Sequence, residues 1–204
     1  MKSYSQASQD AFVVCILDGK RDGSFLEIGT NNPVEINNTY LLETEFNWRG
    51  MMVDNSMESM LAAEHKRKSA FYLADVSQKI DWIAALRQAE EINHGTPLHA
   101  PRRYDYLSLD VDQASLDCLR NLPLKDVRFS VITLEHDEYR RPGTRDQMLQ
   151  ILRDAEYDVL CAGVCDQGLS FEIWAVDRWA LNIPKEAKDK FRRDKPTEWQ
   201  EFFK

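Results

Sequence analysis

The chain has 204 residues, of which 43% are hydrophobic and 29% are charged, a composition typical of one globular domain long enough to bury a sizeable core. Its net charge of −8 disfavours nucleic acid as a partner, because proteins that neutralise many phosphates are usually basic. The first residues do not form a secretory leader, no apolar run nears the length of a membrane span, and the four cysteines form no Cys-x-x-Cys pair. We therefore expect a soluble, cytoplasmic protein with no membrane partner.

Apolar periodicity and capping residues predict helices and strands that alternate along the chain. In chain order, the first half should contain a helix over 8–17, a strand over 24–28, a helix over 39–46, a strand over 50–53, a helix capped by Ser56 and a strand over 70–74. The second half should contain a helix capped by Ser77, a loop over 94–103, a strand over 104–109, a helix over 114–119, a strand over 128–134, a helix begun by the capping box Thr144-x-x-Gln147, and strands over 157–162 and 170–176. In the helix after Ser56, the residues expected to face the core are Met57, Met60 and Leu61.

Strands that alternate with helices predict a parallel sheet that is covered by helices on both faces. No helix separates the last two strands, so they should pair antiparallel. The predicted fold class is thus α/β, a doubly wound, mostly parallel seven-stranded sheet with the last strand antiparallel. We expect one domain over 1–204, with an N-terminal helix in 1–20, the core in 21–177 and a C-terminal extension in 178–204.

The segment from Phe25 to Asp54 has the layout of a site for a nucleoside-bearing cofactor. A strand ends in Glu27-x-Gly29, a helix follows, and a second strand ends on Asp54. Glycine lets the backbone approach a ligand, a helix N-terminus offers N–H groups, and the acid can accept hydrogen bonds from ribose hydroxyls. A single glycine gives no cradle for a pyrophosphate, so S-adenosylmethionine, with its ammonium and carboxylate, fits better than a dinucleotide. The plain alternative for Glu-x-Gly alone is a strand that ends in a turn.

Ligands of such sheets bind at the carboxyl ends of the strands, so the polar strand tips form the candidate site. Asp75 can meet an adenine amino group or can cap the turn that follows it. Asp110 and Asp112 flank a valine, and alternate residues of a strand share a face. The predicted cofactor-binding residues are Glu27, Gly29, Thr30, Asn31, Asn38, Asp54, Asn55, Asp75, Val76 and Asp110.

The fifth strand ends in Glu135-His136-Asp137-Glu138, which places a histidine among acids. Neighbouring carboxylates favour the charged imidazolium and raise its pKa, so His136 is a candidate to take a proton from a hydroxyl. We predict His136 as the catalytic base, with Glu135 or Asp112 orienting it or the acceptor. A plain solvated loop and a site for a hard cation such as magnesium stay open as alternatives. The cation would use Asp110, Asp112, Glu135 and His136.

These residues resemble the FkbM-type methyltransferases in order and combination, over about residues 5–176. The matching blocks are Ser8-Gln9-Asp10 with Phe12, residues 25–29, 38–43 and 48–50, and residues 106–112 and 132–136. The resemblance implies the class I, Rossmann-like methyltransferase fold, S-adenosylmethionine as cofactor, and methylation of hydroxyl groups on sugars, glycans or polyketide-like products. The chain departs from the family pattern at Asp112-Gln113-Ala114-Ser115, where Glu-Gly-Ala-Glu is usual, and at Asp54, where Glu followed by Pro is commoner.

The sequence thus predicts an S-adenosylmethionine-dependent O-methyltransferase that acts on a hydroxyl of a sugar, a glycan or another small molecule. One rival is a metal-assisted O-methyltransferase or an enzyme that methylates an amine. The other rival is a non-catalytic module that only binds a nucleotide-like ligand or a partner. His94 and His99, in the predicted loop over 94–103, are the second choices for the base.

Overall fold

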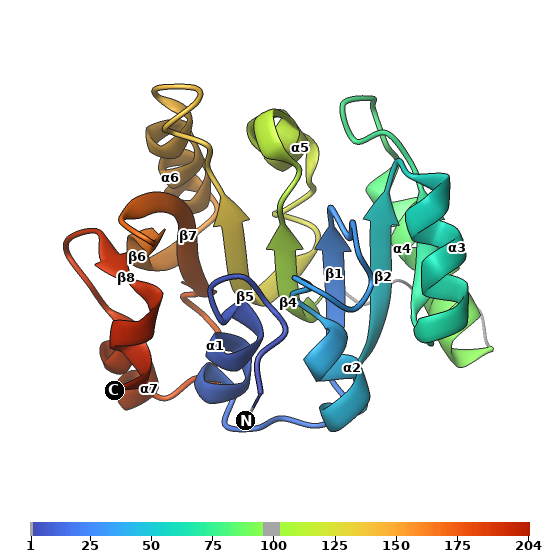
Figure 1. Cartoon of the computed structure of the whole chain (residues 1–204), viewed down its shortest axis with the longest axis horizontal. Coiled ribbons are helices and arrows are strands. Elements are labelled where there is room, and N and C mark those ends of the chain that lie inside the picture. The colour runs from blue at the N-terminus through green and yellow to red at the C-terminus, as the bar shows by residue number, and fades with distance from the viewer. Residues whose placement is uncertain (1, 96–102) are drawn as a thin grey trace.

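One mostly parallel sheet organises the molecule, which a computed structural model describes for residues 2–95 and 103–204 (Figure 1). Its strands follow the order β3-β2-β1-β4-β5-β7-β6-β8 across the sheet. The strands are β1 (Ser24–Ile28), β2 (Arg49–Asp54), β3 (Ala70–Leu73), β4 (Arg103–Leu109), β5 (Arg128–Glu135), β6 (Tyr157–Asp166), β7 (Leu169–Asp177) and β8 (Thr197–Glu198). The helices are α1 (Gln9–Ile16), α2 (Tyr40–Phe46), α3 (Met57–Lys66), α4 (Trp82–His94), η1 (Asp112–Ala114), α5 (Ser115–Asn121), α6 (Thr144–Asp154), α7 (Lys185–Phe191) and η2 (Trp199–Phe203).

Parallel pairing brings the carboxyl ends of β1 to β5 to one edge of the sheet, the upper edge in Figure 1. β7 pairs antiparallel with both β5 and β6, which confirms the antiparallel pairing predicted for the last two long strands. The predicted number of strands is wrong, because the described residues form eight. β8 is only two residues long, and it extends the sheet by pairing with Val164 and Cys165 of β6.

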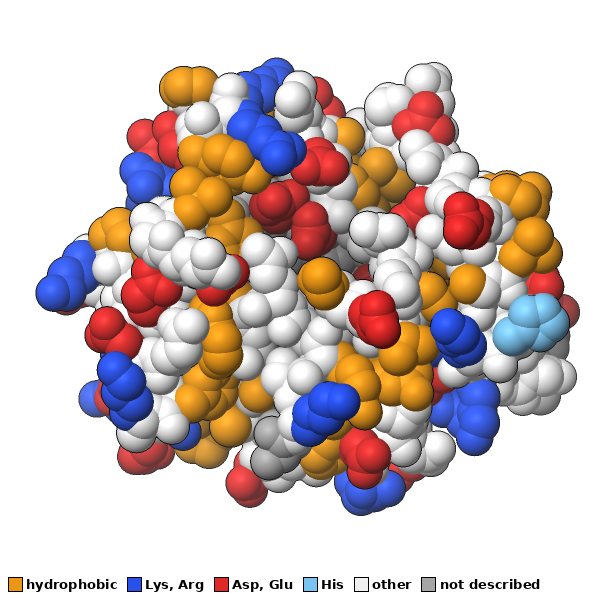
Figure 2. All heavy atoms as spheres, viewed as in Figure 1, with side chains coloured by type: hydrophobic (Ala, Val, Ile, Leu, Met, Phe, Trp, Pro, Cys, Tyr) orange, Lys and Arg blue, Asp and Glu red, His pale blue; other side chains and the backbone are white. Residues whose placement is uncertain are grey.

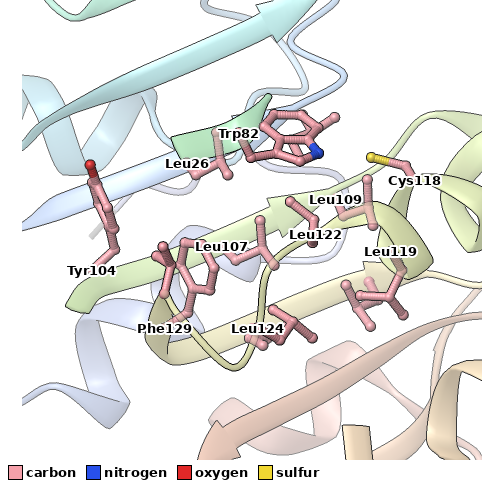
Figure 3. Packing of buried hydrophobic residues seen from close by; sticks show 14 of the residues in the cluster. Leu26, Trp82, Tyr104, Leu107, Leu109, Cys118, Leu119, Leu122, Leu124 and Phe129 are labelled. Carbon is pink, nitrogen blue, oxygen red and sulfur yellow. The ribbon is translucent and has the colours of Figure 1, made fainter. Parts of the chain in front are cut away.

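Helices cover both faces of the sheet, as the alternation of strands and helices predicts. On one face, α4, α5 and α6 pack on side chains from the sheet, and Figure 3 shows Leu107 and Leu109 of β4 packed near Trp82 of α4 and Leu119 of α5. On the other face, a second cluster joins α1, α2, α3 and α7 to the sheet. There Phe12 of α1 stacks on Trp174 of β7 with 4.3 Å between ring centroids.

Helix α3 begins where predicted but buries a different face. The Ser56 hydroxyl accepts a hydrogen bond from the Ser59 backbone N–H at 3.2 Å, so the predicted cap is confirmed. The predicted core face is wrong, because Met57 and Leu61 are 53% and 49% exposed. The helix instead buries the small residues Ser59 and Ala63, which let it lie close to the sheet.

Two other predicted helix caps are wrong for a local reason, since a nearby carboxylate caps each helix, although α6 begins at Thr144 as predicted. Asp81, rather than Ser77, accepts from Ala84 N at 3.0 Å at the start of α4. At α6 the Glu138 carboxylate accepts from the Gly143 and Arg145 backbone N–H groups at 2.8 and 2.9 Å. Carboxylates at a helix start satisfy free N–H groups and favour the positive end of the dipole.

Only part of the predicted loop over 94–103 lies within the described residues. Arg103 begins β4 and His94 is the last residue of α4, so neither lies in a loop. His94 Nε2 pairs with Glu90 Oε2 at 3.4 Å on the same helix. His99 lies outside the described residues. Across 2–95 and 103–204, no helix is long and apolar enough to cross a membrane.

Candidate functional site at the strand ends

A large cavity lies at the carboxyl ends of β1 to β5. Its volume is about 570 Å³, within the range of small-molecule sites. Figure 2 shows acidic side chains gathered in a hollow at this edge of the molecule. The predicted cofactor-binding residues that line it are Gly29, Asn31, Asp54, Asn55, Asp75, Val76 and Asp110. Asp112 and Glu135, two of the three predicted catalytic residues, line it as well.

Gly29 follows β1 in a conformation that only glycine adopts easily, with φ +92°. A Cβ atom at this position would lie 1.6 Å from the Asp110 carbonyl oxygen. The close approach that requires glycine is therefore made by the backbone that follows β4, and this differs from the predicted approach to a ligand. Gly29 holds the tips of β1 and β4 together at the floor of the cavity.

Asp54 ends β2 with its carboxylate fixed from both sides. Its Oδ2 accepts a hydrogen bond from Asn31 N at 2.8 Å, and its Oδ1 accepts one from Ser56 N at 2.9 Å. A carboxylate offers about four lone pairs, so each oxygen keeps one for a ligand. The pair of backbone donors therefore orients Asp54 without using up its capacity to accept hydrogen bonds from two hydroxyls.

Asp75, after β3, caps the turn that follows it and also lines the cavity. Its Oδ1 accepts from Ser77 N at 2.9 Å, and hydrogen bonds from the Ser77 side chain and backbone lower the pKa of its carboxyl group. The neighbouring Val76 is 8% exposed and lines the cavity with apolar surface. Both readings of Asp75 from the sequence, the turn cap and the ligand contact, are thus compatible with its position.

Three predicted cofactor-binding residues lie outside the cavity wall. Glu27 is 2% exposed and accepts from Asn37 Nδ2 at 3.1 Å; burial raises the pKa of its carboxyl group, and the Arg67 guanidinium opposes that rise. Asn38 is 8% exposed and donates to Ser108 Oγ at 2.9 Å, while Thr30 is 1% exposed. These side chains hold the loop between β1 and α2, which carries part of the wall.

The tips of β4 and β5 bring acids together. Burial raises the pKa of Asp110, and it also raises the pKa of Glu135, with the Asp110, Asp137 and Asp112 carboxylates adding to the effect on Glu135. Asp112, at φ +48°, is exposed and forms an ion pair with Arg140 Nη1 at 2.8 Å. The predicted meeting of Asp110, Asp112 and Glu135 at one place is what the structure shows.

His136 departs from its prediction in position and in charge. Its side chain is 0% exposed and is not among the residues that line the cavity, because successive strand residues point to opposite faces and Glu135 takes the cavity side. Its Nδ1 accepts from Glu138 N at 3.1 Å. The predicted rise in pKa is wrong: burial, followed by the charge of Arg145, lowers the pKa of His136 to about 4. The imidazole is neutral near pH 7.

A second cavity of about 280 Å³ adjoins the first and shares Glu135 and Gln6 with it. Its other walls include Tyr139, Leu169 and Phe171, so it mixes hydrogen-bonding groups with apolar surface. Sequence reasoning missed Gln6, which precedes the first helix and belongs to no pattern. It also gave no role to Asp137, although the alternate-residue argument used for Asp110 and Asp112 applies equally to Glu135 and Asp137.

The fold has counterparts among solved structures. The O-methyltransferase from Bacillus cereus in complex with SAH matches with a TM-score of 0.53 at 16% identity, covering 85% of this chain and 82% of that one. N-methyltransferase NodS from Bradyrhizobium japonicum in complex with S-adenosyl-L-homocysteine matches with a TM-score of 0.50 at 12% identity, covering 85% of this chain and 89% of that one. A SAM-dependent O-methyltransferase from Thermotoga maritima matches with a TM-score of 0.51 at 10% identity, covering 87% of this chain and 67% of that one.

These likenesses show that the chain has the Rossmann-like α/β fold of class I methyltransferases. The similarities establish the fold only and not the activity, because the sequence identities are low and the matched proteins transfer methyl groups to different atoms. No family model matches the chain, and no curated protein sequence matches it significantly.

Gly29→Ala tests the contact between the tips of β1 and β4. We expect it to lower the free energy of unfolding by at least about 3 kcal/mol, because backbone strain and a collision with the Asp110 carbonyl add together. Gly168→Ala is the matched control: φ is +84° and nothing lies within 4 Å of its Cβ position, so strain alone costs about 1–2 kcal/mol. Urea unfolding measures both. Equal losses in the two variants would show that the contact is not tight.

Proposed function

We propose that the chain is an S-adenosylmethionine-dependent O-methyltransferase of the FkbM type that acts on a hydroxyl group of a sugar or glycan. The observation that carries this proposal is the charge of the larger cavity. Five carboxylates and no lysine, arginine or histidine line it among the described residues. Such a wall repels the phosphates of a dinucleotide and attracts a cation. S-adenosylmethionine is a nucleoside that carries a sulfonium cation.

The positions of the wall residues suggest how the cofactor lies. The ribose hydroxyls bind the Asp54 carboxylate, which lines the cavity and keeps a free lone pair on each oxygen. The adenine lies against Val76, with the backbone and carboxylate of Asp75 near its amino group. The sulfonium then lies toward the acids at the tips of β4 and β5, namely Asp110, Asp112 and Glu135. This arrangement follows the general rule that ligands of open α/β sheets bind outside the carboxyl ends of the strands.

The smaller cavity is the proposed acceptor site, because it meets the larger one at Glu135. Tyr139 and Gln167 offer hydrogen bonds to hydroxyl groups, while Leu169 and Phe171 offer apolar surface to the face of a sugar ring.

The acceptor oxygen forms a bond to the methyl carbon, the carbon–sulfur bond breaks, and its electron pair stays on the sulfur of S-adenosylhomocysteine. The hydroxyl proton leaves to water or to an ionised carboxylate at the junction of the two cavities. Alignment of the three reacting atoms contributes several kcal/mol.

We assign the orienting group at this junction to Glu135 and not to His136. Glu135 lines both cavities, whereas His136 is buried beside the backbone of Glu138. The resemblance to FkbM-type enzymes supports a hydroxyl acceptor, and the net charge of −8 disfavours nucleic acid as that acceptor.

Cofactor binding tests the first half of the proposal. S-adenosylhomocysteine should bind and raise the melting temperature, because a ligand selective for the native state stabilises it. Asp54→Ala should weaken binding by roughly 1.5–3 kcal/mol, the value of a hydrogen bond to a charged group. Asp146→Ala, at an acid whose side chain is 76% exposed on α6, should bind as the wild type does. Calorimetry that finds NAD bound and S-adenosylhomocysteine unbound would refute the assignment.

Methyl transfer tests the second half. We expect turnover on at least one member of a panel of free sugars, nucleotide sugars and glycan oligomers. On that acceptor, Glu135→Gln should lower turnover by about 10²-fold, because the acceptor oxygen is no longer oriented, while cofactor affinity changes little. His136→Asn keeps an acceptor for the Glu138 N–H, so its turnover per folded molecule should stay within about threefold of wild type, well short of the loss expected for a base.

The opposite pattern would restore the base predicted from the sequence, namely full turnover in Glu135→Gln with loss in His136→Asn. Transfer to amines alone would move the acceptor class from oxygen to nitrogen. Cofactor binding with no transfer to any acceptor would favour the non-catalytic module.

A further inference from the structure

We propose that Asp112, Glu135 and Asp137 hold one divalent hard cation, Mg²⁺ or Mn²⁺, at the junction of the two cavities. Their carboxylate oxygens lie within 4.8 Å of one another. The three residues come from two neighbouring strand ends, with Asp112 just beyond β4 and the other two at the tip of β5. The inference rests on the proposed function only for its catalytic consequence, since cation binding itself needs no acceptor.

Asp137 is the residue that distinguishes this cluster from an ordinary acidic surface. It is 1% exposed, and within 2–95 and 103–204 neither of its carboxylate oxygens has a hydrogen-bond partner of acceptable geometry, although the Tyr139 hydroxyl lies close enough to interact with it. The Arg140 and Arg141 backbone N–H groups bind its carbonyl oxygen at 2.9 and 2.8 Å, and not its side chain. Burying an ionised carboxylate without a partner is costly, so the site calls for a proton or a cation.

The nearby basic side chains do not fill this role. Arg140 pairs with Asp112 at 2.8 Å, Arg141 lies 3.6 Å from Asp117, and Arg145 lies 3.5 Å from Asp146. None of the ion pairs among the described residues includes Glu135 or Asp137. Glu135 Oε2 is likewise buried with no partner of acceptable geometry, although its carboxyl lies close enough to that of Asp110 to share a proton with it.

The ligand set identifies the class of metal. Three carboxylates and no thiolate or imidazole favour Mg²⁺, Mn²⁺ or Ca²⁺ over zinc or copper. This set differs from the one expected from the sequence, because Asp110 and His136 take no part and Asp137 joins Asp112 and Glu135. Asp112 uses Oδ1 for Arg140, which leaves Oδ2 for the ion.

The position of the cluster also suggests what the cation does. Glu135 borders both cavities, so an ion bound to it has open positions that face the acceptor site. A hard cation there would bind the acceptor oxygen, fix its direction toward the cofactor and lower the pKa of the hydroxyl group. The substrate class that follows is a hydroxyl compound able to offer oxygen ligands to a metal, such as a vicinal diol of a sugar.

The test is Mn²⁺ binding to the full chain after EDTA treatment. Binding is measured by calorimetry and by the Mn²⁺ electron paramagnetic resonance signal. Wild-type protein should bind one Mn²⁺ per chain with a dissociation constant below about 1 mM. Asp137→Asn should weaken binding at least about 10-fold. The Asp146→Asn control should bind as the wild type does, because that acid is exposed and lies outside the cluster.

A melting experiment separates loss of the site from loss of the fold. Without metal, Asp137→Asn should melt at or above the wild-type temperature, because it removes a buried charge; with Mn²⁺, only the wild type should gain stability. Absence of Mn²⁺ binding in the wild type, or wild-type affinity in Asp137→Asn, would overturn the proposal. Mn²⁺ binding without S-adenosylhomocysteine binding would instead overturn the proposed function and leave the cation site standing.

Discussion

Mutual repulsion of carboxylates at one edge of the sheet is the constraint on which the site depends. Two unit charges about 4 Å apart repel by about 4 kcal/mol at an effective dielectric constant of 20. The parallel topology fixes the strand ends side by side, and Gly29 packs the tip of β1 against the backbone at Asp110, so the acids cannot move apart cheaply. Protons relieve part of this repulsion, as the raised pKa values of Asp110 and Glu135 show. Positive ligands relieve the rest, and both proposed ligands, the sulfonium cofactor and a divalent cation, are positive.

The gathering of acids at the strand tips could be predicted from the sequence because it depends on topology and not on the direction of individual side chains. Once strands alternate with helices, Asp54, Asp110 and Glu135 must lie at the carboxyl ends of parallel strands, and the structure brings all three to one cavity. The antiparallel hairpin of β6 and β7 follows in the same way from a missing helix. The eighth strand was missed because two residues, Thr197 and Glu198, carry no periodicity.

What the sequence could not supply was the direction of individual side chains. Near the end of a strand, a shift of one position moves an ionisable side chain from the cavity to the core. The sequence does not show where the alternation of side chains between the two faces ends. His136 falls on the core side, so burial lowers the pKa that its acidic neighbours were expected to raise. Helix α3 shows the same limit, because Ala63 faces the sheet where larger apolar residues were expected. Glu138, six residues before Thr144 in sequence, caps α6 through a loop that no short pattern describes.

The most direct test of this account is a crystal structure of the protein with S-adenosylhomocysteine and Mn²⁺, with the metal located from its anomalous signal. The account predicts ribose hydroxyls on the Asp54 carboxylate, the sulfur near Glu135, and one Mn²⁺ bound by Asp137 and Glu135 between the two cavities. A nucleoside bound away from Asp54 and Glu135, with the cavity at the strand ends left to solvent, would contradict the account at its centre.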